Sequence, residues 1–459
     1  MKTPSSPEKL DAVRPESAGH PSFGEAFLFW LKLGFISFGG PTGQIAIMHT
    51  ELVEKKKWIS EARFLHALNY CMLLPGPEAQ QLATYVGWLL HKTWGGIVAG
   101  AFFVIPSIFI LWGLSYIYVT LGNLPWVAAI FYGLKPAVLA IVAAAVIRIG
   151  SRALKNEVMW TLAAAAFVAI FFLHVPFPLI IISAALIGFF GGKWKRDKFL
   201  VIRGHGKPKN DSVLDDSPAI PEHAKPSWNR ALRVCITWIL LWWAPVALLG
   251  FWLGSNHTVV REGVFFSIAA MVTFGGAYAV LPYVAQQAVQ NYGWLNAGQM
   301  LDGLGLAETT PGPLIMVTQF VGFLGAWNNP GQLPPILSAT LGALVTTWAT
   351  FVPCFLWIFL GGPHIEQLRG NEGLTTALSA VTAAVVGVVL NLAVWFGLHV
   401  IFPSANVVDW FAVVVGLVAF IGMTRWKWDI IPVVLGAGLV GLIFKMLLYR
   451  LIPRELLGW

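Results

Sequence analysis

The feature that most constrains the fold is a Pro-Gly-Pro turn that interrupts a long apolar segment at residues 75–77 and again, 236 residues later, at residues 311–313. Proline removes a backbone donor and clashes with the preceding helical turn, while glycine permits a sharp reversal. Each segment is therefore predicted to stop and restart as two half-helices, about 61–74 and 78–91 in the first copy. Backbone freed at membrane depth is tolerated only beside protein or water, so both breaks are candidate solute sites.

Composition places the chain in a membrane. Of its 459 residues, 57% are hydrophobic and only 11% are charged, which indicates an all-α polytopic membrane protein surrounded by a lipid bilayer. The net charge of +8 comes mainly from short segments between apolar stretches, a topology signal that argues against nucleic-acid binding. Cys71, Cys235 and Cys354 lie in apolar segments without C-x-x-C spacing, so we expect no disulfide, no metal site and no cofactor.

The chain divides by composition into five parts. Two are polar: a Pro-containing N-terminal tail expected to be disordered, and a central stretch rich in Lys, Arg, Asp, Pro and Ser that reads as a cytoplasmic linker. The predicted parts are the tail (1–22), a first transporter repeat (23–192), the linker (193–230), a connecting transmembrane helix (231–253) and a second transporter repeat (262–450).

Three motifs support an internal duplication. Besides the two Pro-Gly-Pro turns, residues 37–40 (Ser-Phe-Gly-Gly) match residues 273–276 (Thr-Phe-Gly-Gly), and residues 58–60 (Trp-Ile-Ser) match residues 294–296 (Trp-Leu-Asn). All three pairs share the offset of 236 residues without a gap, so we interpret the chain as two homologous helical halves.

The orientation of the halves depends on how many times each crosses the bilayer. Six crossings per half, with each broken helix counted once, plus the connecting helix give about thirteen transmembrane segments and favour inverted repeats. Arg148, Arg152 and Lys155 then share the linker's side, as the positive-inside tendency requires, but the basic run 55–57 does not. A re-entrant hairpin at the break would return that run to the linker's side and change the parity.

Several motifs in order resemble the chromate ion transporter family. They are Phe-Gly-Gly-Pro at 38–41, Trp-Ile-Ser at 58–60 and Leu-Pro-Gly-Pro-Glu-Ala-Gln-Gln-Leu-Ala-Thr-Tyr at 74–85, with a shorter echo in the second half. The resemblance is to the long, two-domain members, and it implies export of chromate across the bacterial inner membrane, which gives chromate resistance. The second half departs from the pattern, because Ala277 replaces Pro41 and Leu314 replaces Glu78. Unequal contributions of the two halves are therefore expected.

An anion also suits the two breaks on physical grounds. A helix N-terminus presents unpaired N–H groups and about half a positive charge, so the half-helices after each break can hold an oxyanion, and nearby glycines allow close backbone approach. The alternative is that these motifs are only hinges and packing contacts. The predicted substrate-binding residues of the breaks are Phe38, Gly39, Gly40, Pro75, Gly76, Pro77, Phe274, Gly275, Gly276, Pro311, Gly312 and Pro313.

Charged residues within apolar stretches are further candidates, because a charge at bilayer depth costs at least about 2.5 kcal/mol. Lys32, Arg63 and Lys135 are predicted to attract the anion, with snorkelling, an interfacial position and a structural ion pair as their respective alternatives. Glu78 and Glu308, which flank the breaks, are predicted to couple transport to protons or to a gate; helix capping is the alternative for Glu78.

Other functional classes fit less well. The chain has no Gly-x-x-x-x-Gly-Lys-Ser/Thr phosphate loop and no His-Glu-x-x-His motif, so we expect a secondary transporter rather than an ATPase or a membrane-embedded enzyme. An anion channel and a carrier for sulfate or another oxyanion remain alternatives, because sulfate shares the charge and tetrahedral shape of chromate. Chromate, sulfate as its competitor and lipid are the expected partners, and a homo-oligomer is compatible with the sequence.

Overall fold

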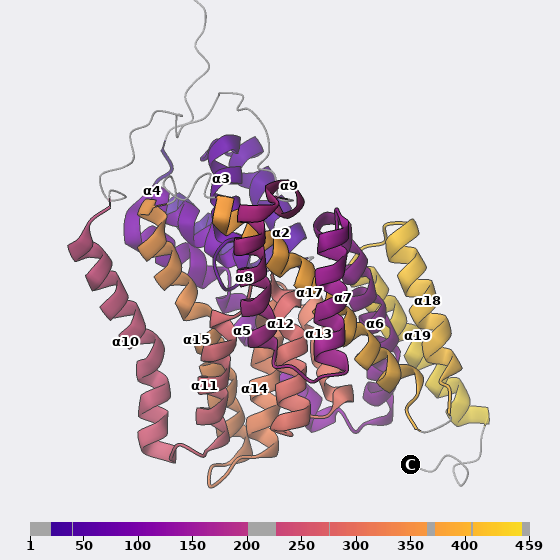
Figure 1. The fold of residues 1–459 in the computed structure, drawn as a ribbon. Coiled ribbons are helices and arrows are strands. Elements are labelled where there is room, and N and C mark those ends of the chain that lie inside the picture. Colours follow the sequence, from indigo (N-terminus) through magenta and orange to yellow (C-terminus); the bar gives the residue numbers. More distant parts are fainter. Residues whose placement is uncertain are drawn as a thin grey trace, which may run out of the picture.

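A computed structural model describes residues 20–38, 40–200, 226–274, 276–364, 372–404 and 407–451. Within these ranges the regular elements are helices, apart from one isolated bridge between Ser404 and Val407, so the all-α expectation is confirmed there. Figure 1 shows a bundle in which the N-terminal helices lie at one end and the helices of the second repeat extend to the other.

The first repeat contains short helices followed by long ones. Its elements are α1 (Phe23–Ile36), α2 (Gly40–His49), η1 (Thr50–Lys55), α3 (Glu61–Cys71), α4 (Glu78–Phe102), α5 (Ile105–Leu121), α6 (Pro125–Ala153), α7 (Glu157–Phe171), α8 (Phe177–Trp194) and α9 (Arg196–Phe199). Ser60 caps α3 by accepting a hydrogen bond from the N–H of Arg63 at 3.2 Å, a role suited to its short side chain. Non-helical dihedral angles at His91 and Lys92 kink α4 at the predicted end of its first half.

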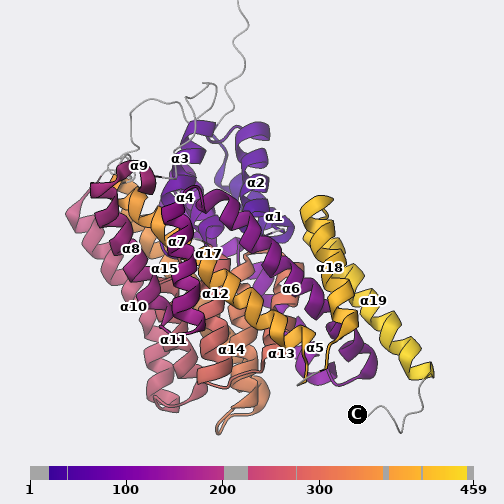
Figure 2. The ribbon, with the colours of Figure 1, turned by 45° about the vertical axis from the view of Figure 1, so that its right-hand side comes forward.

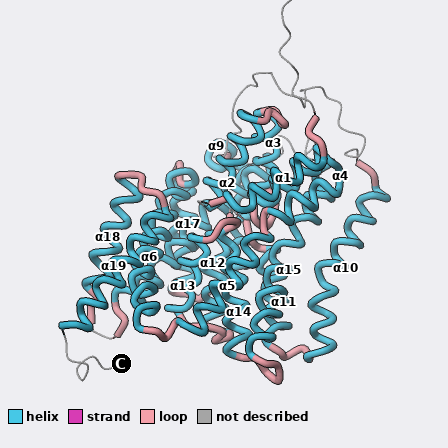
Figure 3. Tube along the Cα trace, turned by 180° about the vertical axis from the view of Figure 1, so that it is seen from behind, coloured by secondary structure: helices cyan, strands magenta, loops and turns pink. Residues whose placement is uncertain are grey.

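A single long helix, α10 (Trp228–Leu253), leads to the second repeat at the edge of the bundle (Figure 3). The elements that follow are α11 (Thr258–Met271), α12 (Ala277–Ala285), η3 (Gln286–Asn291), α13 (Ala297–Thr309), η4 (Leu314–Met316), α14 (Val317–Asn328), α15 (Pro335–Gly361), η5 (Gly362–His364), α17 (Glu372–Ile401), α18 (Trp410–Arg425) and α19 (Ile430–Leu451). Asn296 and Gln299 form a reciprocal capping box at the start of α13.

In the first repeat, α1 and α2–η1 form a hairpin, as do α3 and the first half of α4. Contacts between their ends establish this geometry. Lys56, just after η1, forms an ion pair of 3.3 Å with Glu25 in the first turn of α1. His91, at the kink of α4, places Nε2 3.0 Å from the carbonyl oxygen of Pro21, just before α1. The outer ends of these segments therefore lie together, and the motif loops lie at the opposite end of each hairpin.

The second repeat repeats this arrangement. Arg261, in the first turn of α11, lies over the ring of Tyr292, just after η3, at 5.0 Å from the ring centre. Asn328, the last residue of α14, donates a hydrogen bond of 2.8 Å to the carbonyl of Trp294, just before α13. Each Pro-Gly-Pro turn therefore joins two half-helices that fold back on one another.

At each break the two half-helices fold back on one another, which differs from the single interrupted span expected from the sequence. In the described residues, seven helical stretches are long and apolar enough to span a membrane, and α7, η4–α14 and α18 are shorter apolar segments. The count is below the predicted thirteen because the segments from α1 to the kink of α4, and those from α11 to α14, are short. The α1–α2 loop was not predicted as a second hairpin.

The long helices are exchanged between the repeats. α6 packs along α18 and α19, whereas α17 packs along α7 and α8 (Figure 2). Glycines allow these close contacts: a Cβ atom at Gly133 of α6 would lie 2.8 Å from Cα of Gly441 on α19, and one at Gly188 of α8 would lie 2.7 Å from Cα of Ala377 on α17. α4 likewise packs against α15, and α5 packs against α14. Each repeat therefore completes the core of the other.

Basic residues gather at the end of the bundle that carries α3 and α9 (Figure 1). Contacts tie several of these segments together: Arg196 of α9 pairs with Glu372 at the start of α17, and Arg230 of α10 lies over the ring of Trp88, near the kink of α4. Lys55, Lys56 and Lys57 precede α3, and Lys193, Lys195, Arg196 and Lys198 lie at the end of α8 or in and beside α9.

Candidate functional site

The loops of the two repeats bind each other through a reciprocal pair of hydrogen bonds. The N–H of Gly76 donates to the carbonyl of Thr273 at 2.8 Å, and the N–H of Gly312 donates to the carbonyl of Ser37 at 2.7 Å. Gly76 and Gly312 are equivalent in the two repeats, as are Ser37 and Thr273. The four motif loops thus meet inside the bundle, and the Pro-Gly-Pro turn of one repeat is fastened to the Gly-Gly loop of the other.

Both turns require glycine. Gly76 has φ 118° and Gly312 has φ 102°, values that residues with a Cβ atom rarely adopt. A Cβ atom at Gly76 would also lie 2.9 Å from Sγ of Cys354, and one at Gly312 would overlap Oγ of Ser107. Ser107 in turn donates a hydrogen bond of 2.5 Å to the carbonyl of Pro311. The predicted sharp reversal at each break is therefore confirmed.

Three buried glutamines of the first repeat lie at or beside the two breaks. Gln44 of α2 donates a hydrogen bond of 2.5 Å to the carbonyl of Gly312, and Gln81 of α4 donates one of 2.8 Å to the carbonyl of Pro75. Neither amide atom of Gln80 has a hydrogen-bond partner in the described part of the chain, although the residue is fully buried. A buried amide without a hydrogen-bond partner carries a desolvation penalty. The amide of Gln80 therefore has unused hydrogen-bonding capacity beside the first break.

The helix N-termini at the two breaks differ. α4 begins directly at Glu78, so the N–H groups of residues 78–80 have no partner within the helix. After the second break a 3₁₀ turn, η4, precedes α14. The N–H groups of the two glycines are occupied by the loop-to-loop bonds, whereas those of the first turn of α4 have no partner among the described residues. The first break is also partly exposed at Pro75, whereas residues 310–313 are buried.

The two predicted coupling carboxylates lie on the two breaks. Glu78 reaches toward the other repeat, with Oε1 3.7 Å from the position of a Cβ atom at Gly276. Glu308 is buried and accepts a hydrogen bond of 2.6 Å from the hydroxyl of Tyr278. The breaks thus combine helix N-termini with carboxylates.

The three predicted cations are not brought together. Lys135 lies 3.8 Å from Oδ2 of Asp302, which also accepts a hydrogen bond of 2.9 Å from the hydroxyl of Tyr118. Lys32 is exposed on the outer face of α1, and Arg63 is half-buried in the first turn of α3. Of these three, Lys135 has a buried carboxylate partner, the arrangement expected of its structural alternative.

The remaining predicted residues belong to the same loops. Phe38 and Phe274 are half-buried, and Gly40 and Gly276 share positive φ values of 65° and 88°. Gly39 and Gly275 lie outside the described residues. Pro77, Pro311 and Pro313 are buried around the turns. Among the described residues no group of three or more His, Cys, Asp or Glu side chains has the arrangement of a metal site.

Sequence reasoning missed several polar side chains. Those at or near the breaks are Ser37, Gln44, Gln80, Gln81, Ser107, Thr273 and Tyr278. A usable signal for three of them was the contrast between the repeats, because Gln44, Gln80 and Gln81 correspond to Val280, Met316 and Val317. The predicted inequality of the halves therefore extends well beyond Glu78.

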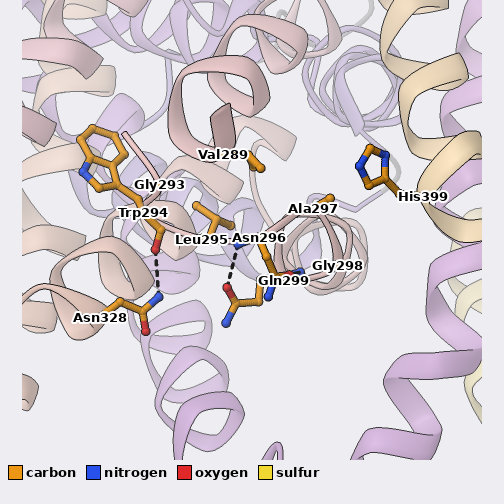
Figure 4. Close-up of a pocket in the computed structure, with 10 residues that line it drawn as sticks. All are labelled: Val289, Gly293, Trp294, Leu295, Asn296, Ala297, Gly298, Gln299, Asn328 and His399. Carbon is orange, nitrogen blue, oxygen red and sulfur yellow. Dashed lines mark hydrogen bonds between the residues drawn. The ribbon is translucent and has the colours of Figure 1, made fainter. Parts of the chain in front are cut away.

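A separate surface hollow of about 610 Å³ lies at the opposite end of the second repeat. Figure 4 shows it at the start of α13, lined by Asn296, Gln299 and Asn328, with His399 of α17 on the other side. Trp294 forms part of its wall. The hollow does not include the Pro-Gly-Pro turns, so it is an opening on that end of the protein rather than the site between the repeats.

Comparison with known proteins agrees with the paired architecture. The sequence profile described as chromate transporter matches residues 24–189 and 262–442, once in each repeat. The chain belongs to the chromate transporter family. It is therefore a multi-pass membrane protein of that family, and the two matched regions coincide with the two sets of hairpins and long helices.

Individual members of the chromate transporter family match nearly the whole chain. A chromate transport protein of Cupriavidus metallidurans is 29% identical over 452 residues, which cover 98% of this chain and 100% of the relative. One from Pseudomonas aeruginosa is 29% identical over 451 residues, covering 95% and 96%, and a probable chromate transport protein of Synechococcus elongatus is 28% identical over 415 residues, covering 89% and 91%. No solved structure matches the chain.

Proposed function

We propose that this protein is a secondary carrier that exports chromate from the cytoplasm across the inner membrane and thereby gives chromate resistance. The observation that carries the proposal is the pair of equivalent hydrogen bonds between the repeats, from the N–H of Gly76 to Thr273 and from the N–H of Gly312 to Ser37. Equivalent hydrogen bonds that join two repeats can be broken and remade as the repeats move. A site between two such repeats is the arrangement used by alternating-access carriers.

The anion site of this proposal is the space at the first turn of α4. Free N–H groups of residues 78–80 and the helix dipole favour negative charge, and the unpartnered amide of Gln80 adds a donor. Opening the loop-to-loop bonds would free the N–H groups of Gly76 and Gly312 as further donors. Phe38, Phe274 and the prolines of both turns would then shape the site rather than supply charge.

We further propose that the two repeats are inverted, with the basic end of the bundle in the cytoplasm. Two hairpins per repeat leave an even number of crossings, and α10 adds one more crossing between the repeats. The run Lys55–Lys57, which precedes α3 and conflicted with the predicted topology, then shares a side with the α8–α9 region, because α3 and α9 lie at the same end of the bundle (Figure 1). Each of the two hairpins, α1–α2 and α3–α4, removes one crossing from the repeat. The number of crossings per repeat therefore stays even, and the two repeats still have opposite orientations.

The membrane potential alone can drive this export. Each elementary charge gains roughly 2.3 kcal/mol per 100 mV, so a dianion leaving a negative interior gains roughly twice that. Lys32 and Arg63 are proposed to attract the anion toward the membrane, whereas Lys135 has a further structural partner in Asp302. Glu78 and Glu308 are proposed to link the movement of the breaks to a proton or to gating, because both adjoin Gly-Gly loop segments.

Uptake of labelled chromate into inverted membrane vesicles tests the proposal. In such vesicles export becomes uptake, so an inside-positive potential should drive saturable, protein-dependent accumulation. Vesicles without the protein and right-side-out vesicles under the same imposed potential are the controls. Cells that produce the protein should also grow at chromate concentrations that stop cells lacking it.

The same assay separates the alternatives. Strong sulfate uptake without chromate uptake would overturn the choice of substrate, while sulfate that only competes is compatible with it. A channel would show neither saturation at low substrate nor counterflow, and that result would overturn the carrier mechanism. The mass of the purified protein in detergent would establish whether it forms a homo-oligomer.

A further inference from the structure

One buried carboxylate in the second repeat has no compensating group. Glu262, in the second turn of α11, is fully buried, and neither of its oxygens has a hydrogen-bond partner in the described part of the chain. The buried carboxylates Asp302 and Glu308 each accept a hydrogen bond from a tyrosine hydroxyl. An ionised carboxylate without such a partner is strongly disfavoured away from water, so Glu262 requires either a ligand or a proton.

The slot that encloses Glu262 is closed by two glycines. A Cβ atom at Gly325 of α14 would overlap Oε1, and one at Gly342 of α15 would lie 2.7 Å from Oε2. Neither α14 nor α15 contains Asp, Glu, Lys, Arg or His. The carboxylate is therefore held between uncharged helices whose backbones approach closely because side chains are absent.

The other titratable groups nearby are engaged elsewhere. Arg261, next to Glu262, lies over the ring of Tyr292, and Tyr278 of α12 donates to Glu308. The remaining titratable groups on the main elements packed against α11 are Arg230, Arg233 and Cys235 near the far end of α10, Tyr283 of α12, and Cys354 of α15, which adjoins Gly76. None of these described groups forms an ion pair or a hydrogen bond with Glu262.

The first repeat does not have the same combination of a buried acid and a facing glycine. At the equivalent positions the first repeat has Ala26 in place of Glu262 and Leu89 in place of Gly325, and both are buried. The first repeat thus has a small apolar residue where the second has the acid, and a buried leucine where the second has the glycine. A small residue replaces a large one where the acid is present, so the space is matched to the acid.

The slot also adjoins an opening to solvent. The position of a Cβ atom at Gly325 lies 3.0 Å from Cβ of Trp294, and Trp294 and Asn328 line the hollow of about 610 Å³ (Figure 4). Asn328, one turn after Gly325, holds the Trp294 carbonyl at 2.8 Å. Trp294 therefore contacts both the hollow and the helix that closes the slot. In the proposed orientation this hollow faces the outside of the cell.

We propose that Glu262 is a proton-binding site reached from the outer hollow past Trp294. In the closed slot its carboxyl group carries the proton; when α11 and α14 separate, the O–H bond breaks and the proton passes to water. Because only the neutral form fits the closed slot, proton binding favours that conformation and links the transport cycle to the outside pH. The coupling to chromate rests on the proposed function, whereas proton binding does not.

Reconstituted protein in inverted vesicles tests the coupling. With no potential imposed, an acidic lumen should increase chromate uptake by the unaltered protein, because the lumen corresponds to the cell exterior. Glu262→Gln, a neutral side chain of the same shape, should keep potential-driven uptake and lose the increase caused by the acidic lumen. Glu157→Gln, which alters an exposed glutamate in the first turn of α7, is the matched control and should respond as the unaltered protein does.

An unchanged response of Glu262→Gln, or no response of the unaltered protein, would overturn the coupling. Absence of chromate uptake in every arm would instead overturn the proposed function. Infrared difference spectra between acid and alkaline conditions then decide on the proton site itself. A protonated-carboxyl band that Glu262→Gln lacks and Glu157→Gln retains is expected; a band identical in both variants would refute it.

Discussion

The side-chain amide of Gln44 donates a hydrogen bond of 2.5 Å to the carbonyl of Gly312, so the first repeat holds the second Pro-Gly-Pro turn through both its carbonyl and its N–H. The first turn lacks the matching bond, because Val280 stands where Gln44 would be. Gln81 instead binds Pro75 within its own repeat. The second break is consequently the more firmly fixed of the two, and it is also the more buried.

Alanine at Gly312 should impair both stability and transport. A residue with a Cβ atom at φ 102° is strained by about 1–2 kcal/mol, and the added atom would overlap Oγ of Ser107. Ser107→Ala removes that oxygen, so the double variant should recover part of the loss. Thermal unfolding in detergent and chromate uptake measure the effect. Gly113→Ala, where no atom lies within 4 Å of the new group, is the control; equal losses in both glycine variants would contradict the prediction.

Cysteine labelling should place the ends of the hairpins on opposite sides of the membrane. In a variant without the three native cysteines, Lys57→Cys should react with an impermeant reagent from the cytoplasmic side, and Gln332→Cys from the outside. Both positions are exposed, Lys57 after η1 and Gln332 between α14 and α15. Lys195→Cys supplies the reference for the linker's side. Labelling of Lys57→Cys from the outside would restore a single crossing per broken helix.

Lys135 and Asp302 should behave as a structural pair. Lys135→Met leaves the buried Asp302 with Tyr118 as its partner among the described residues, and loss of a partner by a buried polar group typically costs about 1–3 kcal/mol. Asp302→Asn added to Lys135→Met should restore much of the unfolding temperature. If the double variant is stable but transports no chromate, Lys135 acts on the anion as the sequence suggested, and its pairing is not its main role.

Removal of the Tyr278 hydroxyl should disturb the second break without changing its shape. Tyr278→Phe deletes the donor of the 2.6 Å hydrogen bond to Glu308, and an unsatisfied buried acceptor costs about 1–3 kcal/mol. We expect a lower unfolding temperature together with slower uptake. Tyr116→Phe, at an exposed position on α5, should have neither effect. Normal uptake by Tyr278→Phe would show that Glu308 does not depend on this bond.

Local features of the sequence predicted much of the secondary structure and the location of the candidate site. The dihedral restrictions of Pro-Gly-Pro located both breaks, because this effect acts within a few residues. The uninterrupted offset between the repeats identified the duplication. The inequality of the halves was also visible, since Leu314 replaces Glu78 at the first residue after the break.

The direction of the chain after each break was not predictable in this way. A turn at Gly76 allows the second half-helix either to continue across the membrane or to fold back, and contacts such as Lys56 with Glu25 decide between the two. The bond from Gly76 to Thr273 joins positions far apart in sequence, so no local pattern announces it. Glu262 carried a usable signal, because a single acid in an apolar segment is costly, but Arg261 beside it made the position resemble a helix end.

Because long helices of the two halves pack on one another, each half needs the other to bury its helix surfaces. α6 lies against α18 and α19, and α17 lies against α7 and α8, so these long helices of each half pack on helices of the other half. A chain cut within residues 201–225 should therefore reassemble from two separately made pieces, whereas either piece alone would present unfilled glycine-lined grooves to lipid. The duplication thus produced not two linked transporters but one bundle whose assembly requires both copies at once.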